Sequence, residues 1–163
     1  MSIPVTRSAA AQKLSPTELR AWRGMLRVHS RLVKALDAQL EHDHALPLTS
    51  YEVLLRLGDA EGQRMRMCDL ADSILLSRSG LTRLVDRLER EGLLVRVACD
   101  DDARGSYAKL TPDGRAKLDA SRATHLDGVR SLFIDHISDE ELDTLGRLWD
   151  RLIPNDPDLT HTD

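Results

Sequence analysis

The 163-residue sequence predicts a mainly α-helical protein that carries one small β-hairpin. Three observations lead to this fold class. Apolar residues recur at helical spacing toward both ends of the chain, helix-start signals precede these runs, and only residues 93–110 read as two strands joined by a turn. The chain suits one ordinary core and is too short for two full domains, so a single domain spanning residues 1–163 is expected.

The first expected helix covers about residues 16–42. Ser15 is placed to cap it, Pro16 occupies its first turn, and Glu18 completes a capping box. Apolar residues then repeat every three or four positions as far as Leu40. At about 1.5 Å per residue this helix would be roughly 40 Å long, which is more than one small core needs. A surface outside that core is therefore expected to cover part of the helix.

Two shorter helices are expected next. Thr49 and Glu52 form a second capping box, for a helix that ends near Gly58. After a loop, residues 66–73 read as another short helix. Residues 74–76 are a tight turn of sequence Ile-Leu-Leu, which lacks the glycine often found between the helices of a helix-turn-helix. The sequence therefore predicts the two-helix unit but leaves the geometry of its turn open.

The next helix, residues 77–91, has the clearest pattern in the chain. Ser77 is a good N-cap, and Gly92 ends the helix. Four apolar residues follow at i, i+3, i+4 and i+7, and they form one stripe: Leu81, Leu84, Val85 and Leu88. The arginines at 78, 83 and 87 lie off this stripe, so they are expected on the exposed surface of the helix.

A hairpin follows this helix. Residues 93–98 predict a strand, residues 99–106 an acidic turn that contains glycine, and residues 107–110 a returning strand. A helix, a turn, a second helix and a hairpin in this order predict a winged helix-turn-helix over residues 48–111, with the hairpin as its wing.

Two more helices complete the expected fold. Thr111 and Pro112 open one that runs to about His136, and Ser138 with Glu141 caps another that Pro154 ends. Apolar faces on such long helices would leave much apolar surface in water, at about 25 cal/mol per Å². Segments 14–45 and 112–154 are therefore expected to be dimerisation helices of a two-fold homodimer.

The charge balance limits the partners that the surface can bind. The net charge is −4 and the isoelectric point is near 5.9, so a polyanion would have to be bound by a local basic patch. The two cysteines, Cys68 and Cys99, are far apart, as is usual in a reducing cytoplasm. Because neither a signal peptide nor a membrane span is recognisable, a cytoplasmic protein without a membrane partner is expected.

Two motifs carry a resemblance to a known family. SRSGLTRLVDRLEREGLL, at residues 77–94, is similar to the recognition helix of the MarR family of bacterial transcriptional regulators. DDARGSYAKLTPDG, at residues 101–114, resembles the D-x-R-G-x-x-x-x-L-T pattern of that family's wing and following helix. The resemblance extends from about Leu14 to Ile153. It implies a dimeric regulator, often a ligand-responsive repressor, that binds pseudo-palindromic operator DNA.

The resemblance and the physical pattern together nominate DNA-contacting residues. A helix fits the major groove of double-stranded DNA, where arginine binds guanine O6 and N7 bidentately. The expected contacts of the recognition helix are Ser77, Arg78, Ser79, Thr82, Arg83 and Arg87. The resemblance places wing residues 98–107 at the minor groove, with Arg104 as its tip cation and Asp102 orienting that arginine. Arg90 is instead expected to pair with Asp86, Glu89 or Glu91 on a solvated surface.

The resemblance also places a small-molecule effector pocket between the dimer helices and the DNA-binding region. The expected lining residues are Trp22, His29, Tyr51 and His125. The competing interpretation of His29 is a hydrogen-bonded core histidine. No cofactor or metal is expected, although His42 and His44, or Cys68 and Cys99, would suit a metal- or redox-sensing regulator of the same fold. Cys68 is expected to pack within its helix.

Other function classes receive less support from the sequence. No phosphate-binding glycine loop, nucleophile elbow or H-E-x-x-H motif occurs, so an enzyme is not expected. A winged helix that serves only as a protein-interaction module remains an alternative. Salt dependence separates the two, because binding through several DNA phosphates weakens steeply as salt rises.

Overall fold

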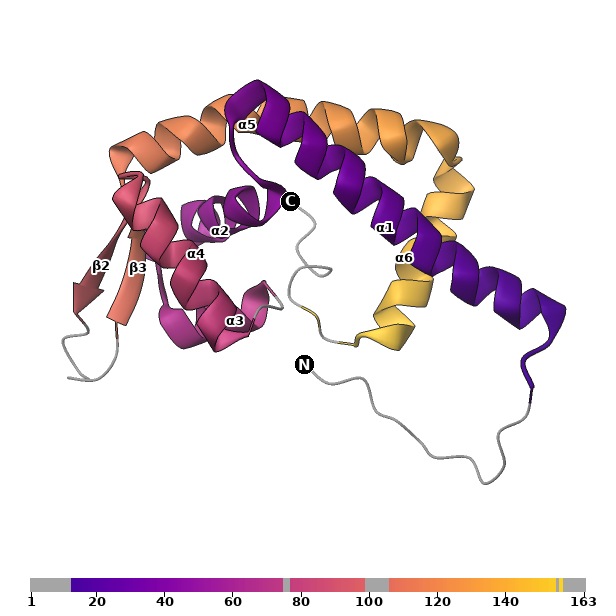
Figure 1. The fold of residues 1–163 in the computed structure, drawn as a ribbon. Helices are drawn as coiled ribbons and strands as arrows, with labels where there is room; N and C mark the ends of the chain where they lie inside the picture. Colours follow the sequence, from indigo (N-terminus) through magenta and orange to yellow (C-terminus); the bar gives the residue numbers. More distant parts are fainter. Residues whose placement is uncertain (1–12, 75–76, 99–105, 155, 157–163) are drawn as a thin grey trace. The chain divides into compact units, whose positions relative to one another are not determined.

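A computed structural model describes residues 13–74, 77–98, 106–154 and 156, with the side chain of Arg78 outside the description. Its elements follow in chain order (Figure 1): α1 Pro16–His44, α2 Leu48–Asp59, the 3-10 turn η1 Glu61–Gln63, β1 Arg64–Arg66, α3 Met67–Ser73, α4 Arg78–Arg90, β2 Leu94–Ala98, β3 Ser106–Leu110, α5 Pro112–Leu132, the 3-10 turn η2 Ile134–His136 and α6 Asp139–Leu152. The predicted fold class, mainly α with a small antiparallel hairpin, is confirmed. In the described part of the chain, no helix is both long and apolar enough to cross a membrane.

The chain forms two compact units. The core unit is Val33–Gly128, and the terminal unit consists of Met1–Leu32 and Val129–Asp163. Helices α1 and α5 each run from one unit into the other. The predicted winged helix-turn-helix, residues 48–111, lies wholly within the core unit.

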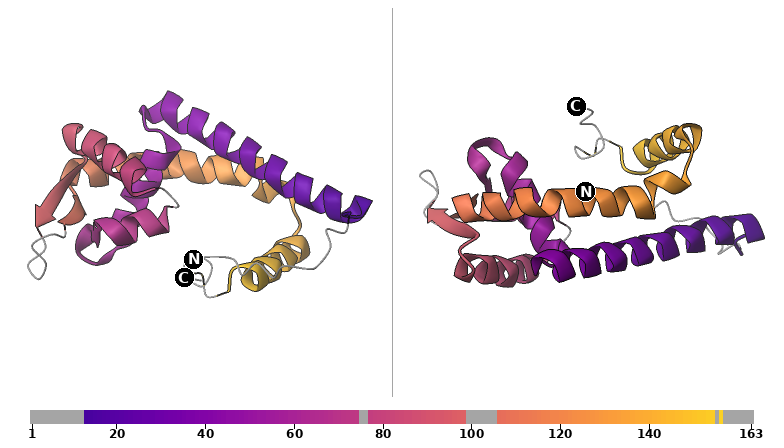
Figure 2. Two further views of the ribbon diagram at one scale, coloured as in Figure 1. Left: turned by 60° about the horizontal axis from the view of Figure 1, so that its bottom comes forward. Right: turned by 90° about the horizontal axis from the view of Figure 1, so that it is seen from above.

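The core unit is built around a leucine-rich interior. Its largest fully buried side chains come from helices and strands alike: Leu40, Leu46, Tyr51, Val53, Leu54, Leu57, Leu70, Leu81, Val85, Leu88, Leu94 and Leu118. Three strands form an antiparallel sheet in the order β1-β3-β2. The β2–β3 hairpin lies beside α4 in each view of Figures 1 and 2. The helix and the wing therefore share one core.

A close backbone approach joins the end of α4 to the start of α5. Gly92, just after α4, has a φ of +74°, a conformation that favours glycine. Its carbonyl accepts a 2.7 Å hydrogen bond from Thr111 Oγ1, which in turn accepts one from the Gly114 N–H. A Cβ at Gly114 would lie 1.9 Å from the Leu93 carbonyl oxygen, so only glycine allows this contact. These contacts fix the path of the chain from the end of α4 into β2.

Two local expectations were wrong. The capping box at Thr49 does not form, because α2 begins one residue earlier, at Leu48, and has Pro47 at its N-cap without a side-chain cap. The Leu48 N–H donates instead to Asp37 Oδ1 of α1 at 2.8 Å. The residues after Gly62 were expected to be loop, but β1 forms there and pairs with β3, placing Met65 opposite Ala108.

The terminal unit is helical and has well-formed caps. Both predicted capping boxes are present, with Ser15 and Glu18 at α1 and with Ser138 and Glu141 at α6. Hydrogen bonding to Ser138 lowers the pKa of Glu141. Helix α5 ends at Leu132, four residues before the expected end, and η2 follows. No described residue of this unit is buried.

Candidate nucleic-acid interface

Helix α4 presents a polar face to solvent because its apolar stripe is held in the core. Leu81, Val85 and Leu88 are at most 1% exposed, while Leu84 is half-buried. Ser77 caps the helix by accepting a 3.1 Å hydrogen bond from the Gly80 N–H. The stripe and the cap were both predicted from sequence, and together they fix which side chains remain outside.

The exposed side of α4 carries most of the nominated residues. Ser77, Ser79, Thr82 and Arg83 are all exposed. The Ser77 and Ser79 hydroxyls lie 3.3 Å apart, and Arg83 Nε donates to the Ser79 carbonyl at 3.4 Å. This weak contact to its own helix leaves the Arg83 guanidinium on the surface. Small hydroxyl side chains beside a long cation are a composition that suits base edges and phosphates.

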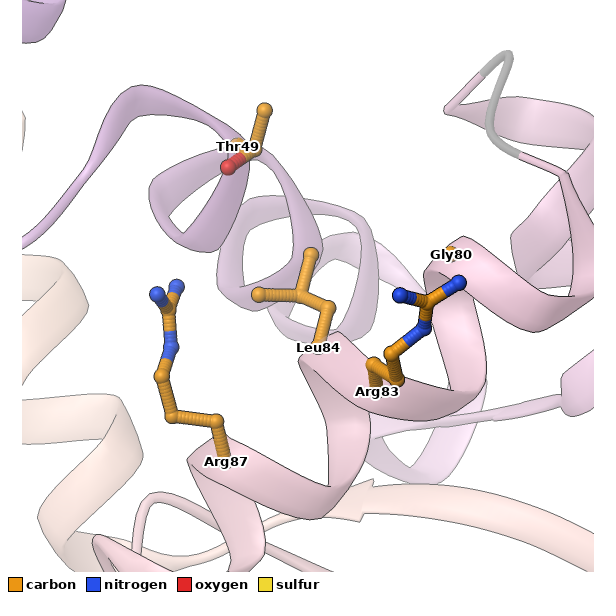
Figure 3. Close-up of a pocket in the computed structure, with 5 residues that line it drawn as sticks. All are labelled: Thr49, Gly80, Arg83, Leu84 and Arg87. Carbon is orange, nitrogen blue, oxygen red and sulfur yellow. The ribbon is translucent and has the colours of Figure 1, made fainter.

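An open pocket of about 290 Å³ lies beside this side of α4 (Figure 3). Its lining residues are Thr49 from α2 and Gly80, Arg83, Leu84 and Arg87 from α4. The figure shows the Arg87 side chain extending from α4 toward α2, whereas the Arg83 guanidinium lies near Gly80 on α4. The guanidinium groups of Arg83 and Arg87, together with the first turn of α2, make this pocket suitable for an anion such as a phosphate.

Arg87 is held more firmly than was predicted. Its Nη2 donates a hydrogen bond to the hydroxyl of the buried Ser50, and its Nε lies 3.9 Å from Glu91 Oε1. Thr49 was not nominated for the site, since the sequence suggested only a helix cap there. Its position in the first turn of α2, beside the pocket next to α4, is the signal that would have identified it.

Arg96 joins the wing to α4, and it was not among the predicted site residues. Its guanidinium donates to Asp86 Oδ1 at 2.5 Å, to a Glu89 carboxylate oxygen and to the Thr82 carbonyl. Its N–H also donates to Glu89 Oε1 at 2.9 Å. Burial by itself would lower the pKa of Arg96, but hydrogen bonds and charge from the two carboxylates raise it. The sequence did hold a sign of this role: Arg96 is a charged residue on the same face of β2 as Leu94 and Ala98, the face that is turned toward α4.

The expected pairing of Arg90 with a carboxylate was wrong. Arg90 Nε donates to the backbone carbonyl of Asp86 at 3.2 Å. The carboxylates of Asp86 and Glu89 are engaged by Arg96, while Glu91 lies nearest to Arg87. Arg90 is still a residue of the helix surface, as expected.

Several nominated groups lie outside the described residues. They are Asp102, Arg104, Cys99 and the side chain of Arg78, together with the other residues of segment 99–105 and turn residues 75 and 76. The assignment of Arg104 to a wing tip and of Asp102 to its orientation therefore stays a prediction.

Two of the four nominated effector residues are in contact. The rings of Tyr51 and His125 have their centroids 4.5 Å apart, with 34° between their planes. Burial lowers the pKa of His125 and raises that of Tyr51. The buried His125 Nδ1 has no hydrogen-bond partner among the described residues. Trp22 and His29 belong to the terminal unit and are exposed, so the interpretation of His29 as a core histidine was wrong.

The described residues that would suit metal or redox sensing do not lie together. His42 Nδ1 contacts Asp43 Oδ1 at 2.7 Å, whereas His44 Nε2 contacts Thr124 Oγ1 at 2.8 Å. Within the described ranges, no three His, Cys, Asp or Glu side chains are placed to hold a metal ion. Cys68 is exposed on α3, near Asp69, so the expectation that it packs within its helix was wrong.

Comparisons with known proteins agree with the geometry. Residues 46–106 match the family model described as MarR family. The solved structure of AbsC, a MarR family transcriptional regulator from Streptomyces coelicolor, is 35% identical, with a TM-score of 0.82 over 86% of this chain and 95% of that one. The chain belongs to the MarR family.

Two other relatives of this MarR-family chain are also transcriptional regulators. Sco3205, a MarR family regulator from Streptomyces coelicolor solved in complex with DNA, is 31% identical, with a TM-score of 0.84 over 93% of this chain and 98% of that one. HTH-type transcriptional repressor YetL of Bacillus subtilis is 30% identical over 73% of this chain and 75% of its own length. The protein is accordingly a transcriptional regulator of the MarR family and not an enzyme.

Proposed function

We propose that this MarR-family regulator binds a pseudo-palindromic operator in double-stranded DNA as a homodimer, represses transcription there and is released by a small-molecule effector. The observation that carries the proposal is the exposed polar side of α4, with Arg83 at the edge of a pocket that also holds Arg87. The DNA complex of Sco3205 and the repressor name of YetL support it by relationship. Action on chromosomal DNA would place the protein in the cytoplasm.

In this proposal α4 enters the major groove. Ser77, Ser79, Thr82 and Arg83 are exposed along it, and an arginine that binds guanine bidentately discriminates by about 1–3 kcal/mol. Thr49 and Arg87 border the pocket beside α4 and would hold a backbone phosphate there. Wing residues 98–107 would reach the adjacent minor groove through Arg104, oriented by Asp102, and Arg78 would add a further contact from the start of α4.

The homodimer is supported by the surface of the terminal unit. Seven large apolar side chains of this unit in α1, α5 and α6 are between 39% and 53% exposed: Trp22, Met25, Leu26, Val28, Leu132, Leu148 and Leu152. Apolar surface on this scale is unfavourable in water at about 25 cal/mol per Å². Segments 14–45 and 112–154 of a second copy would cover it. Sedimentation that finds a monomer at micromolar concentration would contradict this part of the proposal.

The effector site is proposed around the Tyr51–His125 ring pair. A tilted ring pair with an unsatisfied buried nitrogen offers an apolar surface and one polar anchor, which suits a small aromatic or otherwise planar molecule. The assignment of Trp22 and His29, which belong to the terminal unit, stays a prediction. Titration of candidate effectors into wild-type protein and into a Tyr51→Ala variant, followed by tryptophan fluorescence, tests this assignment; equal affinity for both proteins would remove Tyr51 from the site.

The DNA-binding proposal is tested on the protein's own selected operator. Selection from random duplexes should return a two-fold motif with half-sites about one helical turn apart. Arg83→Ala combined with Arg104→Ala should then weaken operator binding by at least tenfold. Arg90→Ala is the matched control on α4, since Arg90 Nε donates to the backbone carbonyl of Asp86 in its own helix, and the affinity of this variant should stay within about twofold of wild type.

The decisive outcome is the difference between the two variants. If the double variant protects the operator at wild-type affinity, the assignment of Arg83 and Arg104 to the interface is wrong. A protein that selects no DNA motif, and whose binding to any duplex is insensitive to salt, would instead fit a winged helix used only for protein interaction.

A further inference from the structure

The wing sheet has an outer face that the α4 contacts leave uncovered. In antiparallel pairs, directly opposed residues share a face, and so do residues two apart in one strand. Arg64 is opposite Lys109, Arg66 is opposite Tyr107, and Val95 and Val97 are opposite Lys109 and Tyr107. These six residues form what we call the outer sheet face: Arg64, Arg66, Val95, Val97, Tyr107 and Lys109. Arg96, on the other face, contacts α4.

Three of the six outer-face residues are cations. Arg64 and Lys109 are exposed, and the guanidinium carbons of Arg64 and Arg66 lie 4.8 Å and 5.5 Å from the centre of the Tyr107 ring. Stacking on a ring orients a guanidinium, and the exposed Arg64 can still present its N–H edge to an anion. None of the described strand residues on this face is acidic, although the chain as a whole carries a net charge of −4. The cations are thus concentrated here against the general charge.

We propose that the outer sheet face binds DNA backbone phosphates that flank the half-site read by α4. This inference rests on the proposed function and extends it to DNA beyond the half-site. Arg96 holds α4 against the inner side of β2, so the outer face lies on the side of the hairpin away from α4. With α4 in the major groove and the wing in the next minor groove, the duplex on that far side is the flanking DNA.

An acidic protein segment is the competing occupant, since Val95 and Val97 are 43% and 36% exposed and would suit a partly apolar partner. DNA is favoured because the face is continuous with the proposed interface: β2 and β3 both lead into the wing segment, and the cations on this face come from two neighbouring strands, β1 and β3. Phosphate contacts of this kind carry no sequence information and appear in affinity and salt dependence.

The test compares two duplexes of the selected operator. The short one ends at the outer edges of the two half-sites, and the long one extends about one helical turn further on each side. Wild-type protein should bind the long duplex more tightly and with a steeper salt dependence. The Arg64→Gln, Lys109→Gln variant should lose this gain, and its salt slope on the long duplex should fall by up to about 1.8 per protomer, that is 0.9 for each lost phosphate contact.

Three controls separate the loss of these two charges from a folding defect and from a general loss of positive charge. Binding of the short duplex by the glutamine variant should stay within about twofold of wild type, which also shows that α4 is intact. The charge-preserving variant Arg64→Lys, Lys109→Arg should keep most of the long-duplex gain. A matched loss of two exposed cations elsewhere, Lys13→Gln before α1 with Arg90→Gln at the end of α4, should leave the gain unchanged.

The outcomes distinguish this inference from the proposed function. If the glutamine variant keeps the wild-type affinity and salt slope on the long duplex, the outer sheet face does not bind flanking phosphates, and an acidic protein becomes the better occupant. If wild-type protein binds short and long duplexes equally, the inference also fails while operator binding stands. If wild-type protein binds neither duplex, both fail together.

Discussion

The two units of the chain differ in what holds them together. All side chains that the structure describes as buried lie between Leu36 and Gly128, in the core unit. The terminal unit has helices of similar quality, with capping boxes at Ser15 and Ser138, but its apolar side chains are exposed. Sequence patterns that form good helices therefore do not by themselves supply a core. The core unit is stabilised within one chain, whereas the exposed apolar side chains of the terminal unit would be covered by the second copy in the proposed homodimer.

The largest expected difference between the two units is in how their stability responds to truncation of one leucine in each. Leu88 is fully buried in the core unit, and Leu148 is 40% exposed in the terminal unit. Leu88→Ala should lower the free energy of unfolding by about 2–5 kcal/mol at every protein concentration, because it leaves a cavity. Leu148→Ala should mainly raise the dissociation constant of the dimer. Urea denaturation at several concentrations, together with sedimentation, measures both.

One result would contradict this difference between the core unit and the terminal unit. If Leu148→Ala costs as much as Leu88→Ala at concentrations where the protein is monomeric, the terminal unit has a core of its own and does not depend on a second copy.

The arginine ion pairs of the two units offer the next comparison. Arg96 is 28% exposed and bonds Asp86 and Glu89, whereas Arg147 is 62% exposed and pairs with Asp143 on its own helix. Arg96→Gln should cost about 1–2 kcal/mol, after allowance for solvent screening, and should loosen the wing. Arg147→Gln should cost at most about 0.5 kcal/mol. Urea denaturation compares them; equal costs would mean that Arg96 does not join β2 to α4.

Sequence predicted the features of α4 that depend on local chemistry. Ser77 caps its own helix, Gly92 ends it, and Leu81, Val85 and Leu88 follow helical spacing whatever they pack against. The exposed position of Arg83 follows from that stripe. These features need only residues within one or two helical turns of each other, so a single sequence specifies them.

Features that depend on distant partners were missed. Strand β1 has only three residues, too few for its alternation of arginine and methionine to indicate a strand, and it exists because β3 pairs with it. Thr49 was expected to start α2, but Asp37 of α1 bonds Leu48 instead. The role of Arg96 appears only when β2 lies against α4. In each case a contact across the fold outweighs the local pattern.

Helix caps give a smaller, matched comparison. Ser77 and Ser138 both accept a hydrogen bond from a backbone N–H of the first turn, in the core unit and the terminal unit respectively. Ser77→Ala should lower the free energy of unfolding by about 1 kcal/mol, as for other N-caps. Ser138→Ala should weaken α6, and with it dimerisation, but not the unfolding of the core unit. Hydrogen exchange of the α4 and α6 amides distinguishes these effects, and protection lost in both helices with either variant would show that the units unfold as one.

The smallest expected effect concerns pH and lies in the core unit, at His125. Burial lowers the pKa of His125 in the folded protein, while the unfolded chain has a pKa near the usual value of about 6.5. As pH falls below that value, the unfolded state binds a proton that the folded state does not, so stability is lost toward acid. His125→Phe keeps a ring against Tyr51 and removes this proton uptake. Its free energy of unfolding should therefore fall less steeply than that of wild type below about pH 6.5. Urea denaturation at a series of pH values measures both slopes. If the two slopes are equal, the folded and unfolded states protonate this histidine alike, and its contact with Tyr51 does not keep it neutral.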